Sequence, residues 1–178
     1  RTSDGGTRVD FFWAQDARAT ASGPVPFGRA WDREALEAEL DRPAATTAER
    51  LQRLGLIEPA RGGPAPLSRR LGHGTHVADL AAGFDPASAP RDARVVAVTL
   101  PALVTRDTSG GSLTPFLVAA LDHILDRAAL ISRTEGAPVP VYVNFSYALS
   151  GGAQNGLHPI ETAIDALIAA HEVRMAEL

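Results

Sequence analysis

The sequence predicts an α/β fold in which helices cover both faces of a parallel sheet. Strand-like and helix-like segments alternate from residue 73 to the end of the chain. The stretch 94–100 is almost continuously apolar, which is typical of a strand that is covered on both faces. Parallel neighbours are joined by right-handed crossovers of helical length, so a βαβα alternation favours a parallel sheet.

The first strand is predicted at 7–13, where β-branched and aromatic residues follow a Gly-Gly turn. A proline-containing loop separates it from a helix at 31–40, in which apolar residues recur at helical spacing and Asp32 is a suitable N-cap. A second short helix is expected at 46–54. The stretch 56–70, with three prolines and a Gly-Gly pair, is predicted to be irregular.

The second half is expected to contain a helix at 73–82, the strand at 94–100 and a long amphipathic helix at 113–131. A further strand is predicted at 138–146 and a final helix at 158–175. The apolar stripe of the long helix comprises Phe116, Leu117, Ala120, Leu121, Ile124 and Leu125. The inward face of the final helix is predicted from Ile160, Ile164, Leu167 and Ile168. We expect 1–70 to be a variable N-terminal segment and 71–178 the α/β core of the same domain.

Composition narrows the classes of function. The chain has 178 residues, 45% of them hydrophobic, which is enough for one domain core. A net charge of -4 with dispersed arginines argues against a nucleic-acid partner. The chain contains no cysteine, so it has neither disulfides nor a cysteine nucleophile. No stretch has the length and apolarity of a membrane span, and the first residues are not typical of a signal peptide, so the compartment stays open.

The most informative motif is the run Gly-His-Gly-Thr-His at 72–76, which places a histidine at the start of a predicted helix. The positive end of a helix dipole disfavours imidazolium, so His73 is suited to accept a proton near neutral pH as a general base. Gly72 and Gly74 leave space for a substrate or a hydroxyl beside the ring. Thr75 is expected to begin the packed face of the helix.

This run resembles the His-Gly-Thr-His motif of the subtilisin-like serine proteases, the subtilases. In that family the first histidine is the base of the catalytic triad and the second supports the helix. The resemblance therefore makes His73 the catalytic base, with His76 and Thr75 supporting it beside the two glycines. It implies a subtilisin-like three-layer fold and hydrolysis of a peptide or protein substrate through an acyl-enzyme. The resemblance covers roughly 72–178.

A second resemblance lies at 144–152, which reads Asn-Phe-Ser-Tyr-Ala-Leu-Ser-Gly-Gly. The corresponding subtilase segment, Asn-x-Ser-x-Gly-Gly, binds the substrate backbone as an added strand. The match implies that Ser146, Tyr147 and Ala148 line the substrate cleft. The sequence departs from the pattern after Ser146, and Tyr147 is expected to narrow the specificity pocket.

Gly110 and Gly111 fall where the family has the opposite wall of this cleft. Residues without side chains there would allow a peptide backbone to pair edge-on. The alternative is an ordinary turn that leads to a helix cap at Ser112.

The rest of a serine-protease triad is not found in the chain. The nearest aspartate motif is Asp4 before Gly5 and Gly6, without a preceding apolar strand, and Asp10 and Asp16 match less well. No Gly-Thr-Ser motif follows the histidine. We expect the triad aspartate to precede Arg1 and the serine to follow Leu178, so that the isolated chain is inactive. Exposed sheet edges of such a fragment would favour self-association.

Other interpretations stay open at this stage. One is a non-catalytic α/β binding module or pseudo-protease that keeps the fold without the triad. Another is a metallohydrolase built on His73 and His76, for which no third ligand is evident. The resemblance implies no cofactor, and a structural calcium ion, which the family can hold, is not assignable to residues here. Of the other histidines, His123 and His171 are expected to be solvated and His158 to lie at a helix cap.

Overall fold

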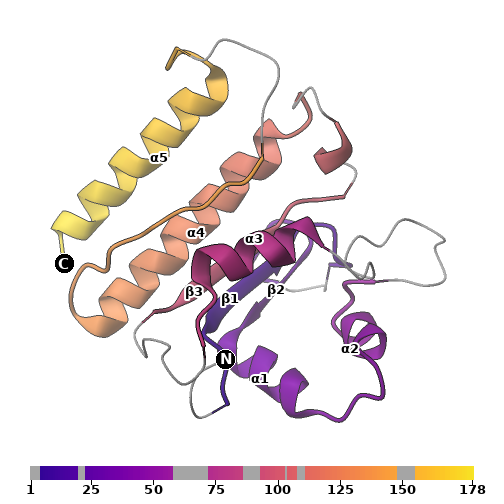
Figure 1. Cartoon of the computed structure of the whole chain (residues 1–178). Coiled ribbons are helices and arrows are strands. Elements are labelled where there is room, and N and C mark those ends of the chain that lie inside the picture. The colour runs from indigo at the N-terminus through magenta and orange to yellow at the C-terminus, as the bar shows by residue number, and fades with distance from the viewer. Residues whose placement is uncertain are drawn as a thin grey trace. The chain divides into compact units, whose positions relative to one another are not determined.

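In the residues that it describes, the structure, a computed structural model, has a mixed α/β fold of five α-helices and a three-stranded sheet (Figure 1). It describes residues 5–19, 23–57, 72–85, 93–102, 104–107, 111–147 and 155–178. The chain forms two compact units, Arg1–Ala102 and Leu103–Leu178. The α/β class predicted from the sequence is confirmed. The sheet is mixed, however, where the sequence predicted a parallel one.

The sheet belongs to the first unit and has the strand order β2-β1-β3. Its central strand β1 (Val9–Ala14) pairs with β2 (Arg29–Asp32) in antiparallel and with β3 (Val95–Thr99) in parallel orientation. The predicted strands at 7–13 and 94–100 are therefore confirmed. All five residues of β3 are half-buried, so this strand is less covered than its apolar sequence predicted.

Strand β2 corrects the prediction of a helix beginning at Trp31. The Trp31 indole lies opposite Phe12 in the antiparallel register and stacks on its ring at 5.4 Å. Gly28 turns the chain into β2 at φ +66°, where a Cβ atom would lie 2.2 Å from the Ala14 carbonyl oxygen. These contacts join residues distant in sequence, which is why helical spacing alone extended the helix too far.

Helix α1 (Arg33–Asp41) begins directly after β2, and the predicted cap is confirmed because the Asp32 carboxylate accepts from the Ala35 amide at 2.9 Å. Helix α2 (Thr47–Arg53) is capped by Thr46, whose hydroxyl accepts from the Glu49 amide at 3.1 Å. Leu36 of α1 and Leu54, the C-cap of α2, pack on a small core of Ala14, Ala17 and Trp31.

A buried carboxylate joins three elements of this unit. The Asp10 side chain is only 3% exposed and is ion-paired with both Arg33 and Arg94. Arg33 Nε donates to Asp10 Oδ1 at 2.6 Å, and Arg94 Nε donates to Oδ2. The register between β1 and β3 shifts at this point, with Val9 opposite Val95 and Phe11 opposite Val96. Asp10 is thus the extra residue of a β-bulge, and its carboxylate binds the first residue of α1 and the residue before β3.

The second unit is helical. After a 3-10 turn, η3 (Val104–Arg106), helix α4 runs over Thr114–Glu135 and packs along α5 (Pro159–Ala176), as Figure 1 shows. Four of the six residues predicted for the apolar stripe of α4 are buried, and Phe116 and Ile124 are half-buried. On α5, Ile160 is buried as predicted, Ile164 and Leu167 are half-buried, and Ile168 is 42% exposed, contrary to the prediction.

The strand predicted at 138–146 is not formed. These residues follow an irregular course outside the sheet. Pro138 and Pro140 have no amide hydrogen to donate to a strand ladder. The Val139 amide between them donates to Ser132 Oγ of α4 at 3.1 Å instead.

Two histidines differ from the prediction that they are solvated. His171 on α5 is only 8% exposed, and His123 on α4 is half-buried. Burial lowers the pKa of both imidazoles, and Arg174 and Arg127 respectively lower it further. His158 confirms its predicted place at a cap, since its Nδ1 accepts from the Ile160 amide at 3.2 Å.

We predict that Asp10→Asn lowers the free energy of unfolding by about 2 kcal/mol, because two arginines lose a buried anionic partner. The measurement is urea denaturation followed by tryptophan fluorescence. Asp16→Asn, the same change at an exposed carboxylate beyond the end of β1, is the control and should have little effect. Equal stability of the two variants would contradict a structural role for Asp10.

The lowered pKa values of His171 and His123 predict that the chain becomes less stable as the pH is lowered. Because the pKa of His171 is lower in the folded chain, stability is fully present above the ordinary histidine pKa of about 6.5 and is lost as the pH falls through it. Thermal unfolding measured between neutral and mildly acidic pH should show this loss. His171→Leu should flatten part of the dependence, leaving the part due to His123. An unchanged pH profile in His171→Leu would refute the assignment.

Candidate functional site

The histidine motif lies at the start of helix α3 (His73–Ala82), whose bounds match the helix predicted from the sequence. Gly72 is the N-cap in an extended conformation, and no side chain caps the helix. The His76 amide donates to the Gly72 carbonyl at 3.1 Å and closes the first turn. His73 is therefore the first helical residue, at the positive end of the helix dipole.

The residues around His73 are accessible. His73, Gly74, Thr75 and His76 are all exposed, and α3 has no buried residue. Thr75 is exposed, so it does not begin a packed face as predicted. A Cβ atom on Gly74 would have no atom within 4 Å, whereas one on Gly72 would lie 3.2 Å from Thr75 Oγ1. Open space thus adjoins Gly74, and the turn at Gly72 is tight.

The other end of α3 is held by Arg8, which precedes β1. Its guanidinium donates to the Ala82 carbonyl and, at 3.5 Å, to the Ala93 carbonyl, and it lies 4.9 Å from the centre of the Phe84 ring. The helix ends at Gly83, where a Cβ atom would lie 2.3 Å from the Asp79 carbonyl oxygen. These contacts fix the carboxyl end of α3 to the start of the central strand.

The aspartates considered for the triad have different surroundings. Both carboxylate oxygens of Asp10 are bonded to guanidinium groups, so this residue is committed to the fold. Asp16 lies at the carboxyl end of β1, is exposed, and accepts from the Ala102 amide at 3.1 Å through Oδ2. Asp4 lies outside the described residues.

A second group of predicted site residues lies in the unit Leu103–Leu178. The Tyr147 hydroxyl donates to the Asp107 backbone carbonyl at 2.6 Å. The Asp107 carboxylate in turn accepts from the Ser112 amide at 3.1 Å. The structure therefore joins Tyr147, from one predicted wall of the cleft, to Asp107, which precedes the other predicted wall in sequence.

The remaining predicted cleft residues are placed in part. Ser146 is exposed and its hydroxyl is 3.3 Å from Asn144 Oδ1, and Gly111 is exposed. Gly110 and Ala148 lie outside the described residues. The alternative cap at Ser112 is wrong, because the N-cap of α4 is Leu113 and no side chain caps it.

Two features of these groups were not predicted from the sequence. One is the hydrogen bond between Tyr147 and Asp107, which are separated by 40 positions. The other is the position of Asp16 at the carboxyl end of a strand in a parallel pair, where the active sites of α/β proteins commonly lie. Tyr147 could have indicated the first of these features, since a tyrosine after Ser146 departs from the subtilase pattern.

Within the described ranges, no three His, Asp or Glu side chains come together as metal ligands would. None of the helices in this part of the chain has both the length and the apolar character that crossing a bilayer requires.

No protein-family model, curated protein or solved structure matches this chain.

The contribution of the hydrogen bond between Tyr147 and Asp107 to stability can be tested by mutation. Tyr147→Phe should lower the free energy of unfolding by about 1 kcal/mol, because one hydrogen bond to Asp107 is lost. Urea denaturation followed by far-UV circular dichroism measures this change. Tyr142→Phe removes the same hydroxyl at a residue that is 94% exposed and should leave stability unchanged. If both variants match the parent chain, the hydroxyl of Tyr147 does not hold the two segments together.

Proposed function

We propose that this chain is part of the catalytic domain of a subtilisin-like serine endopeptidase and that His73 is its general base. The observation that carries the proposal is the position of His73 as the first residue of α3, exposed and next to the open space at Gly74. An exposed imidazole with open space beside it can be approached by a serine hydroxyl, as the base of a catalytic triad must be.

In the proposed reaction, His73 removes the proton from a serine hydroxyl as the serine oxygen attacks the peptide carbonyl carbon. The tetrahedral intermediate collapses when the carbon–nitrogen bond breaks, and His73 returns the proton to the leaving amine. Water then hydrolyses the acyl-enzyme with the same base. The serine, the aspartate that orients the imidazole and the oxyanion donor are proposed to lie outside these 178 residues.

The substrate is proposed to be a peptide or protein chain that binds between two segments of the unit Leu103–Leu178. Ser146, Tyr147 and Ala148 would line one side and Gly110 and Gly111 the other. The hydrogen bond from Tyr147 to Asp107 supports this arrangement, because it fixes the spacing of the two segments. The finer fold that goes with this function is a three-layer domain with helices on both faces of the sheet.

The test is proteolysis by the chain expressed within its full reading frame, with casein and short chromogenic peptides as substrates. We expect activity that is inactivated by a serine-directed fluorophosphonate. His73→Ala should lower kcat by roughly three to six orders of magnitude, as expected for loss of a triad member. The isolated 178-residue chain should be inactive because it lacks the nucleophile.

His158→Ser provides a matched control. His158 is also an imidazole at a helix start, but its Nδ1 accepts from the Ile160 amide, a role that serine can take over. This variant should retain activity. Inactivity of the longer protein would favour a non-catalytic binding module, and activity that a chelator abolishes but a fluorophosphonate does not would favour a metallohydrolase.

A further inference from the structure

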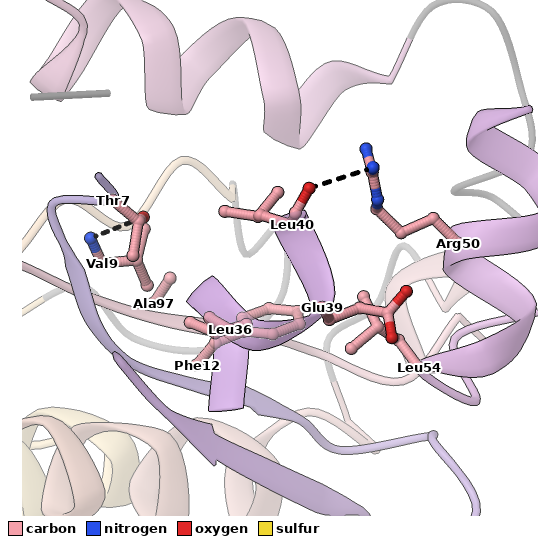
Figure 2. A pocket seen from close by; sticks show the side chains of 9 residues that line it. All are labelled: Thr7, Val9, Phe12, Leu36, Glu39, Leu40, Arg50, Leu54 and Ala97. Carbon is pink, nitrogen blue, oxygen red and sulfur yellow. Dashed lines mark hydrogen bonds between the residues drawn. The ribbon is translucent and has the colours of Figure 1, made fainter. Parts of the chain in front are cut away.

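A cavity of about 330 Å³ lies between the sheet and the two short helices of the unit Arg1–Ala102 (Figure 2). Most of its wall is formed by apolar side chains from β1, β3 and α1 and from the C-cap of α2. These are Val9, Phe12, Ala97, Leu36, Leu40 and Leu54. The volume is within the lower range of small-molecule sites, and cavities of about half this size, lined by apolar groups, bind small hydrocarbons.

The helices leave this space unfilled. Neither α1 nor α2 has a buried residue, although Leu36, Leu40 and Leu54 lie against the cavity. Side chains that border an empty apolar cavity lack packing partners on one side. A bound apolar group would supply those contacts.

The two ends of the cavity differ in charge. Figure 2 shows Thr7, Val9 and Ala97 at one end and Glu39 and Arg50 at the other. Glu39 is compensated by Arg53, whose Nε donates to Glu39 Oε1 at 2.8 Å. The charged end therefore contains an ion pair together with Arg50.

Among the residues that the structure describes, Arg50 is a cation at this end that forms no ion pair. Its Nη2 atom donates to the carbonyl oxygens of Leu40 at 3.2 Å and Arg42 at 3.4 Å. In the described ranges, every ion pair of α2 involves Arg53 and none involves Arg50. A ligand with a carboxylate would gain a charge-assisted hydrogen bond at Arg50.

We propose that this cavity binds a free medium-chain aliphatic carboxylate. The hydrocarbon chain would lie among the leucines, Phe12 and Ala97, and the carboxylate would lie at the Arg50 end. This site is independent of the proposed peptidase chemistry, because none of the residues assigned to catalysis or to the substrate cleft lines it.

The experiment is calorimetric titration of the 178-residue chain with octanoate below its micelle concentration, with octanol and octylamine as comparison ligands. Octanoate should bind more tightly than either. Arg50→Gln should weaken octanoate binding about tenfold and leave octanol binding unchanged, because only the ionic contact is lost. Circular dichroism of each variant establishes that the fold is retained.

Ala97→Leu should abolish binding of both octanoate and octanol by filling the cavity, and Ala97→Val should weaken both if the leucine variant fails to fold. The proposal is overturned if octanoate does not bind, or if Ala97→Leu binds it as well as the parent chain. Equal binding of octanoate and octanol, or equal octanoate binding by Arg50→Gln, would overturn the carboxylate specificity.

Discussion

The buried carboxylate of Asp10 is the constraint on which the sheet-containing unit depends. It binds the first residue of α1 and the residue before β3, so a single side chain fixes three elements at one end of the central strand. An isolated buried carboxylate would be costly, and the two guanidiniums compensate its charge while they remain partly solvated. The β-bulge at Asp10 and the parallel pairing of β3 are therefore linked to one ionic cluster. Asp16 lies just beyond the opposite end of the strand and is exposed.

Local signals predicted much of this fold, and contacts between distant residues account for what they missed. The helix at 73–82 and the cap at Asp32 follow from residues within one or two turns, and both are as predicted. Strand β2 depends on the stacking of Trp31 on Phe12, which helical spacing cannot reveal. The strand predicted at 138–146 had suitable side chains, but Pro138 and Pro140 lack the amide hydrogens that a ladder needs.

The same distinction applies to the candidate site. The sequence predicted His73 at a helix start because the motif is local, and its exposure agrees with a residue that meets a substrate. The bond from Tyr147 to Asp107 crosses 40 positions and depends on where the chain after α4 returns, which no local pattern specifies. His171 was expected in solvent because charged residues adjoin it in sequence, whereas packing of α5 against α4 accompanies its burial.

The distribution of aromatic residues gives the two units separate optical signals. Both tryptophans, Trp13 and Trp31, are buried in the sheet-containing unit, and both tyrosines, Tyr142 and Tyr147, lie in the helical unit. Indole emission consequently reports the melting of the sheet-containing unit alone, whereas near-ultraviolet circular dichroism also contains the tyrosine signal of the helical unit, in a single unlabelled sample. Coincident or separate transitions in these two measurements would reveal whether the units unfold as one cooperative body.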